Sequence, residues 1–222
     1  MSLQATLDAF KADFRAGKPP YNAPTDIHPI MERATADLIA SGQAGRAAKA
    51  GDVAPSFVLR DAHGHAVSSQ ELLSSGPLVV SFYRGVWCPY CNFELQALQN
   101  TLPLIREAGA NLVAISPQLA VNSQKSERVN QLDFPILSDP NNQTAADFGL
   151  RYALPDYLVE LYQRLKNNLP AFNGDDSWTL PIPARYVIAP DRTIVYAEVN
   201  PDYTHRPEPE DLLPLLKQYA MA

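Results

Sequence analysis

The feature that most constrains this 222-residue chain is a pair of cysteines, Cys88 and Cys91, placed between a strand and a helix. Residues 78–83 form a near-continuous apolar run, which is typical of a strand buried on both faces of a sheet. Pro89 suits the first turn of a helix that we expect over residues 89–108, because its fixed φ is already helical. The sequence therefore predicts Cys88 at the N-cap and Cys91 one turn further along the same face.

This placement predicts different acidities for the two thiols. Free backbone N–H groups and the positive end of the helix dipole point at an N-cap sulfur, so we expect a lowered pKa for Cys88. Cys91 lies a turn inward, where we expect its thiol to be less exposed and less acidic. We interpret the pair as a redox dithiol in which Cys88 attacks the substrate and Cys91 resolves the intermediate.

Three other uses of two close cysteines are less consistent with the sequence. A zinc site needs two more ligands, and the four histidines are scattered, with His63 and His65 on a predicted turn. A structural disulfide is typical of secreted proteins, and the N-terminus shows no secretion signal. An N-cap position before a proline is a poor place to bury an inert thiol. We therefore expect dithiol chemistry without a metal or cofactor.

Composition argues against several classes of partner. The chain has 18 Lys and Arg against 24 Asp and Glu, a formal charge of −6, and no long basic run. Nucleic acid and an anionic membrane are therefore disfavoured as partners. The longest apolar run is far shorter than the ~20 residues that a membrane helix needs. We expect a cytoplasmic protein, in a compartment where thiols are kept reduced.

The hydrophobic pattern divides the chain near residue 50. Residues 1–50 are predicted to be a helical N-terminal extension, with apolar stripes on helices over residues 3–14 and 28–39 and an exposed linker from residue 43. Residues 51–222 alternate strands and helices, which predicts an α/β domain with a mixed sheet flanked by helices. Two amphipathic helices without their own core must pack on the rest of the chain or on a second copy. We expect a homodimer braced by the extension.

The cysteine motif also resembles known redox proteins. Cys88-Pro89-Tyr90-Cys91 is similar to the active-site sequence of glutaredoxins, and Trp87 before it is similar to that of thioredoxins. In its wider context the chain resembles the peroxiredoxin-like branch of the AhpC/TSA family over roughly residues 52–219. The resemblance is carried by residues 78–91, Glu94-Leu95, Trp178, Pro181-Ile182-Pro183 and residues 202–209. It implies a thioredoxin-like fold and reduction of hydrogen peroxide or organic hydroperoxides, with a thioredoxin-like protein or glutathione as electron donor.

The chain departs from the peroxiredoxin signature ahead of the reactive cysteine. Where that signature has a proline and a threonine, this sequence has Ser81 and Gly85. The family also has an arginine just ahead of a late strand; Arg185 is close to that place, and we expect it to be out of register. Arg84, four residues before Cys88, either replaces one of these charges or forms a surface ion pair. The alternative function is therefore a thiol–disulfide oxidoreductase acting on protein or glutathione disulfides, and a third is a non-catalytic binding module.

Residues outside the motif are further candidates. The resemblance implies that Pro183 is the cis proline that faces the cysteines in thioredoxin-like folds. Trp178 either covers the cysteines and shapes a substrate pocket or packs in the core of the domain. Tyr203, His205 and Arg206 form a polar cluster that we expect to cap the last helix. The candidate substrate-binding residues are Arg84, Trp87, Trp178 and Pro183.

Overall fold

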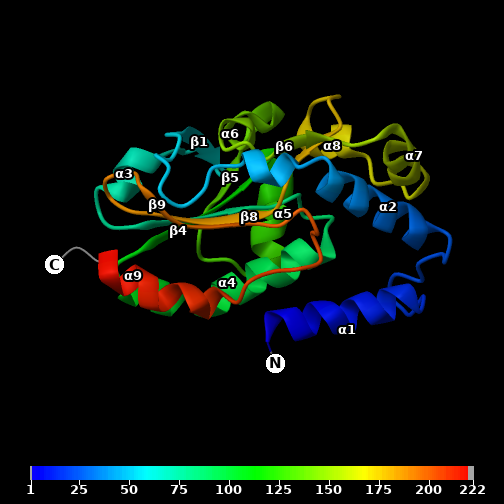
Figure 1. The fold of residues 1–222 in the computed structure, drawn as a ribbon, viewed down its shortest axis with the longest axis horizontal. Helices are drawn as coiled ribbons and strands as arrows, with labels where there is room; N and C mark the ends of the chain where they lie inside the picture. Colours follow the sequence, from blue (N-terminus) through cyan, green and yellow to red (C-terminus); the bar gives the residue numbers. More distant parts are fainter. Residues whose placement is uncertain (1, 220–222) are drawn as a thin grey trace.

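A mixed sheet with helices on both faces is the centre of the computed structural model, which describes residues 2–219 (Figure 1). Within those residues the sheet has seven strands in the order β2-β1-β5-β4-β3-β8-β9. Strands β3, β4 and β5 are parallel, and the other neighbours pair antiparallel. The strands are β1 (Val58–Asp61), β2 (Ala66–Ser68), β3 (Leu78–Phe82), β4 (Asn111–Ser116), β5 (Ile136–Ser138), β8 (Ala184–Ile188) and β9 (Ile194–Val199). Strands β6 (Arg151–Ala153) and β7 (Thr179–Pro181) pair separately.

The helices confirm most of the predicted pattern, including the two in the extension and the long one after the cysteine motif. They are α1 (Leu3–Arg15), α2 (Ile27–Ala40), α3 (Ser69–Leu73), α4 (Pro89–Glu107), α5 (Ala120–Asn130), α6 (Gln143–Asp147), α7 (Asp156–Arg164), α8 (Leu169–Asn173) and α9 (Leu213–Tyr219). Short 3-10 turns cover Gln43–Arg46, Pro140–Asn142 and Pro209–Leu212. No helix among residues 2–219 is both long enough and apolar enough to cross a bilayer.

The central strand β3 divides the core into two layers, because successive side chains of a strand point to opposite faces. Val79 packs in a cluster with Leu95 and Leu98 of α4, whereas Leu78 and Phe82 pack in a second cluster on the other face. Figure 1 shows α4, α9 and α1 together on one side of the sheet, and α2, α6, α7 and α8 on the other. The cysteine motif begins α4 and therefore lies at the end of that helix next to α1 of the N-terminal extension (Figure 1).

The N-terminal extension packs on its own chain. Leu3 and Leu7 of α1 are buried in the cluster formed with α4, and Ile27 of α2 is buried beside α7. The prediction of an exposed linker over residues 43–51 holds for only part of it: five of these residues are exposed, but Ala47 is buried and the N–H of Ala48 donates to the carbonyl of Phe148 at 2.9 Å. These stripes therefore do not by themselves require a partner subunit, and the homodimer stays a prediction.

Candidate active site

The cysteine motif has the local structure that the sequence predicts. Cys88 is the N-cap of α4 with an extended backbone (φ −94°, ψ 109°), and Pro89 occupies the first turn, where its missing N–H leaves no hydrogen bond unmade. The thiol of Cys91 donates to the sulfur of Cys88, with the two sulfurs 2.8 Å apart and both cysteines unlinked. Both side chains are completely buried, so the prediction that Cys91 is the less exposed one is wrong. Both sulfurs lie in the apolar cluster beneath α4.

Arg84 is the charged group nearest to the attacking cysteine. It is 4% exposed, and its Nη2 donates to the sulfur of Cys88 at 3.2 Å. Its Nη1 donates to the hydroxyl of Tyr162 at 3.4 Å. The guanidinium also lies over the ring of Tyr203, 3.7 Å from its centroid, and 5.1 Å from that of Trp87. Arg84 is therefore a buried partner of Cys88 and not part of a surface ion pair.

The pKa values of the two thiols are shifted in opposite directions. Burial alone would raise the pKa of Cys88, but the hydrogen bond from Cys91 and the charge of Arg84 lower it to about 5. Burial raises the pKa of Cys91, and the hydrogen bond and negative charge of Cys88 raise it further. At neutral pH the site therefore holds a Cys88 thiolate beside a protonated Cys91.

A buried ion-pair network lies beneath Cys91. Glu94, one turn after Cys91 on α4, accepts from Nη2 of Arg185 at 2.9 Å and from Nε of Arg206. Nη2 of Arg206 lies 3.9 Å from the sulfur of Cys91. All three charged side chains are at least nine-tenths buried. Arg185 contacts Glu94, and no contact to a sulfur is present among residues 2–219, in agreement with its predicted position out of register.

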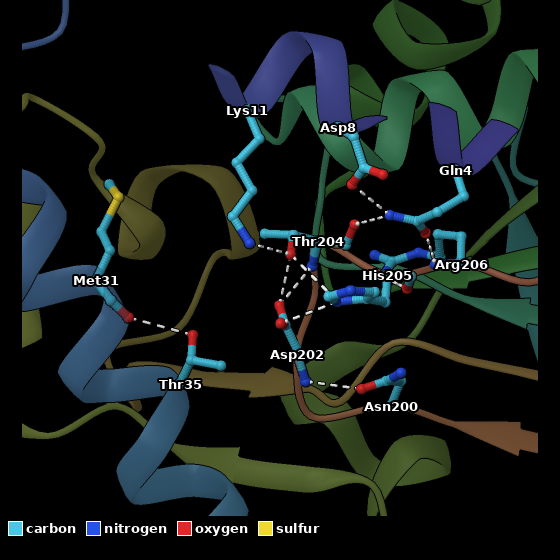
Figure 2. Close-up of polar contacts among 10 residues, drawn as sticks. All are labelled: Gln4, Asp8, Lys11, Met31, Thr35, Asn200, Asp202, Thr204, His205 and Arg206. Atoms are coloured by element: carbon cyan, nitrogen blue, oxygen red, sulfur yellow. Dashed lines mark hydrogen bonds and ion pairs between the residues drawn. The ribbon is translucent and has the colours of Figure 1, made fainter. Parts of the chain in front are cut away.

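The prediction that residues 203–206 cap the last helix is wrong. Arg206 belongs to the network under Cys91, and Tyr203 lies under Arg84. His205 pairs with Asp202, with 2.9 Å between Nδ1 and Oδ2 (Figure 2). The reason is that this loop folds back over the start of α4, a long-range arrangement that local patterns do not encode.

The structure explains why a threonine is absent before the cysteine. Gly85 has φ 146°, a conformation that residues with a side chain rarely adopt. A Cβ there would lie 2.6 Å from the indole nitrogen of Trp87. Within residues 2–219, this Trp87 nitrogen and Nε of Arg84 are buried without a hydrogen-bond partner. The indole thus occupies the place where a threonine side chain would begin, and two free donors remain near Cys88.

Within residues 2–219, the other two candidate residues make no hydrogen bond to the cysteines or to Arg84. The peptide bond before Pro183 is trans, so the predicted cis proline is wrong; Pro183 simply continues the extended chain from β7 into β8. Trp178 packs against the cluster that contains Leu154 and Leu158. Of the two predicted alternatives for this residue, the structure therefore shows packing in the core of the domain. Neither residue lines the cavity beside Arg84 and Trp87. Among the described residues, no three His, Cys, Asp or Glu side chains form a metal-binding group.

Sequence reasoning missed the roles of Glu94 and Tyr162. A signal for Glu94 exists, since it follows Cys91 by three residues and so lies on the same helix face. An acidic residue on that buried face requires a cation. For Tyr162, which comes from α7, the local sequence carries no such signal.

Comparison with known proteins identifies the family. The sequence pattern of the AhpC/TSA family matches residues 50–197, most of the chain, so the chain belongs to this family. The chain is 33% identical over 106 residues to a putative peroxiredoxin of Mycobacterium tuberculosis, covering 48% of this chain and 69% of that protein. It is 32% identical over 100 residues to the chloroplastic peroxiredoxin Q of rice, Oryza sativa subsp. japonica, covering 45% and 46%. The chain therefore spans about half the length of the rice relative that it matches.

Solved structures confirm the thioredoxin-like fold. The crystal structure of Peroxidoxin BcpB from Mycobacterium tuberculosis aligns with a TM-score of 0.60 at 24% identity, over 78% of this chain and 99% of that chain. Peroxiredoxin Q of Xanthomonas campestris aligns with a TM-score of 0.55 at 17% identity, over 74% and 92%.

Proposed function

We propose that this protein is a thiol peroxidase whose Cys88 thiolate reduces hydrogen peroxide or an organic hydroperoxide. The observation that carries the proposal is Nη2 of Arg84 at 3.2 Å from the sulfur of Cys88, inside a buried site. A thiolate, and not a thiol, is the nucleophile, so a cation that keeps Cys88 ionised at neutral pH supplies what the reaction needs. Membership of the AhpC/TSA family supports the same activity.

The reaction consumes two thiols and one hydroperoxide. The Cys88 thiolate attacks the distal oxygen of ROOH, which keeps its proton; the O–O bond breaks, and the alkoxide RO⁻ leaves and takes one proton from the solvent to become ROH. Cys88 is then a sulfenic acid. The sulfur of Cys91 displaces hydroxide from it, and its proton completes a water molecule as the disulfide forms. A thioredoxin-like protein or glutathione, acting as a thiol reductant, returns the disulfide to two thiols.

The structure suggests how Cys91 becomes reactive only when it is needed. Two causes of its raised pKa are the hydrogen bond and the charge of the Cys88 thiolate. Both disappear once Cys88 is an uncharged sulfenic acid. Arg206, 3.9 Å from the sulfur of Cys91, remains and favours its ionisation. Oxidation of Cys88 thus activates the cysteine that resolves it.

Trp87 and Arg84 are the donors that we assign to the bound hydroperoxide. The indole N–H of Trp87 and Nε of Arg84 are buried and unpartnered within residues 2–219. Unmade hydrogen bonds of buried donors cost about 1–3 kcal/mol each, so a ligand that satisfies them is favoured. We also propose that the protein is cytoplasmic and homodimeric, and that residues 1–50 form an extension of a domain that covers residues 51–222, as the sequence predicts.

Thiol consumption under anaerobic conditions tests the peroxidase directly. Reduced protein mixed with one equivalent of cumene hydroperoxide should lose two thiols and yield one equivalent of cumyl alcohol. Trp87→Phe should slow this reaction while Trp178→Phe, the matched control, should not. No alcohol formation above that given by dithiothreitol alone would refute the proposal.

A thiol–disulfide oxidoreductase is the second candidate, and the observation that favours it is Gly85 in place of the family's threonine. Such an enzyme would reduce insulin rapidly, and its Cys91→Ser variant would accumulate a mixed disulfide. Peroxide reactivity at the level of a free thiol, together with rapid insulin reduction, would select this alternative.

A further inference from the structure

We propose that Gln118 and Asn92 are positioning residues, which hold the backbone of Val86 and thereby keep Arg84 against the sulfur of Cys88. This inference deepens the proposed function and rests on it, because it takes the Cys88 thiolate as the reacting group. Within residues 2–219 neither side chain makes a hydrogen bond to a sulfur. Each therefore acts through the turn that joins Arg84 to Cys88.

This turn connects the two residues whose contact stabilises the thiolate. At its start the N–H of Tyr83, next to Arg84, donates to the carbonyl of Ile115 at 3.0 Å, and at its end Cys88 is the N-cap of α4. The N–H of Cys88 donates to the carbonyl of Gly85 at 3.1 Å and closes the turn. Since the sheet fixes one end of the segment and the helix fixes the other, the shape of the turn decides how the guanidinium of Arg84 meets the sulfur.

The turn depends on hydrogen bonds from outside itself. Gly85 has φ 146°, and glycine loses more conformational freedom on folding than any other residue. Side chains from two other segments bond both polar groups of Val86. Its N–H donates to Oε1 of Gln118 at 2.9 Å, and its carbonyl accepts from Nδ2 of Asn92 at 2.9 Å. These two hydrogen bonds supply the order that the glycine does not.

Gln118 is itself fixed by buried hydroxyl groups. It follows β4 and is completely buried, as are Tyr83, Ser123 and Ser126. Its Nε2 donates to the hydroxyl oxygen of Tyr83 at 2.7 Å and to that of Ser126 at 3.1 Å. A backbone N–H can only donate, so the amide oxygen of Gln118 must face Val86. The side chain therefore has a single orientation in which both ends of its amide are satisfied.

Asn92 is held by the neighbouring helix α5. Its Oδ1 accepts from Nδ2 of Asn130 at 3.1 Å, and the same nitrogen donates to the carbonyl of Ser126 at 3.0 Å. Gln118 also contacts Ser126, through the hydroxyl of that residue. One position of α5 thus supports the hydrogen bonds on both sides of Val86.

The side chains of this network are neutral amides and hydroxyls, so they influence the thiolate through geometry. The charge of Arg84 and its hydrogen bond to Cys88 both lower the pKa of that thiol. The hydrogen bond joins Nη2 to the sulfur at 3.2 Å, and such a bond weakens steeply when its angle becomes poor. Loss of either hold on Val86 should therefore raise the pKa of Cys88.

The first test measures the pKa of Cys88 from thiolate absorbance in the Cys91→Ser background, with no peroxide present. Asn92→Ala should raise it by about 1 unit, the low end for loss of a neighbouring opposite charge. Gln118→Met should raise it at least as much, because it leaves a buried backbone N–H without a partner. Asn100→Ala, an exposed asparagine on the same helix, is the matched control and should keep the parent value. An unchanged pKa in Asn92→Ala would overturn the proposal whether or not Gln118→Met folds.

The second test asks whether the effect passes through Arg84. Arg84→Gln removes the guanidinium, so adding Asn92→Ala to it should cause no further shift in the pKa of Cys88. Two shifts that add would mean that Asn92 acts by another route and would overturn the proposal. Urea unfolding measures the stability of the same proteins. A loss of stability in Asn92→Ala without a shift in pKa would show a purely structural role and would also overturn it.

The pH dependence of the reaction with hydrogen peroxide separates this proposal from the proposed function. If the pKa of Cys88 shifts as expected but the wild-type protein reacts no faster than a free thiol, the positioning role stands and the peroxidase fails. If the wild type reacts rapidly and Asn92→Ala has the same midpoint in its pH profile, the peroxidase stands and the positioning role is overturned.

Discussion

The two cysteines share one helix turn and complete burial, yet their environments give them opposite chemistry. The pKa of Cys88 is lowered to about 5, while that of Cys91 is raised well above its usual value. Burial opposes ionisation of both thiols, so burial cannot explain the difference. Two contacts differ: the thiol of Cys91 donates a hydrogen bond to the sulfur of Cys88, which lowers the pKa of Cys88 and raises that of Cys91. Arg84 also contacts the sulfur of Cys88 at 3.2 Å, whereas Arg206 stays 3.9 Å from that of Cys91.

Replacing either cysteine by serine should have the largest effect on the reaction with peroxide. Cys88→Ser should reduce peroxide consumption to that of the mixture without protein, because it removes the sulfur that Arg84 contacts and that attacks the hydroperoxide. Cys91→Ser should react once and stop as a sulfenic acid, which dimedone traps and mass spectrometry detects. Multiple turnovers by Cys91→Ser without added thiol, or activity in Cys88→Ser, would break the assignment of roles.

The network beneath Cys91 should matter most for stability. Glu94→Gln leaves two buried arginines without a carboxylate, which should lower the free energy of unfolding by about 3–5 kcal/mol. Glu107→Gln, an exposed change on the same helix, is the control and should have little effect. Urea unfolding of the reduced proteins measures both. Equal stability of the two variants would show that Glu94 is not the counter-ion of Arg185 and Arg206.

Removing the cation next to Cys88 should bring the two thiols closer in acidity. Arg84→Gln should raise the pKa of Cys88 by about 1–3 units, as expected for loss of a neighbouring opposite charge. Thiolate absorbance in the Cys91→Ser background measures it. Arg151→Gln, an exposed arginine, serves as control. A midpoint near 5 in Arg84→Gln would show that the low pKa does not depend on Arg84.

The same shift has a consequence for stability against pH. The pKa of Cys88 is lower in the folded chain than the ordinary value of roughly 8.5, so between these values the unfolded chain binds more protons. Stability of the reduced protein should therefore rise with pH by up to about 1.4 kcal/mol per unit in that window, and be lost as pH falls through 5. Cys88→Ser should have a shallower slope, and an identical slope would contradict the shift.

The smallest effect on the pKa of Cys88 should come from replacing Tyr203, whose ring lies under the guanidinium of Arg84. Tyr203→Leu removes a cation–π contact worth about 0.5–2 kcal/mol, which loosens Arg84 without removing its charge. The pKa of Cys88 should therefore rise by less than in Arg84→Gln, and the rate with peroxide should fall modestly. A larger shift than that of Arg84→Gln would mean that Tyr203 acts by another route.

Sequence patterns over a few residues predict the local structure of the cysteine motif, but they do not predict which distant residues contact it. The apolar strand, the proline after Cys88 and the spacing to Cys91 are all within a few residues, and the buried strand, the N-cap and the shared helix face that they predict match the structure. The predicted difference in exposure between the two thiols does not, because both are completely buried. Arg206 reaches Glu94 from 112 positions away, and only the folded loop over α4 brings them together. The wrong prediction for Pro183 has a related cause. Resemblance to a fold implied the cis peptide bond, and the residues beside Pro183 carry no signal for it.

Rapid mixing of the reduced protein with hydrogen peroxide across pH tests the central claim, that Arg84 holds Cys88 as the reactive thiolate. In Trp178→Phe, only Trp87 reports on the reaction. The account predicts a fluorescence change complete at one peroxide per chain, with a rate that rises to a plateau around a midpoint near pH 5. The midpoint should move upward in Arg84→Gln. A rate no faster than that of a free thiol, or a midpoint near 8.5 in the Trp178→Phe protein, would contradict the account.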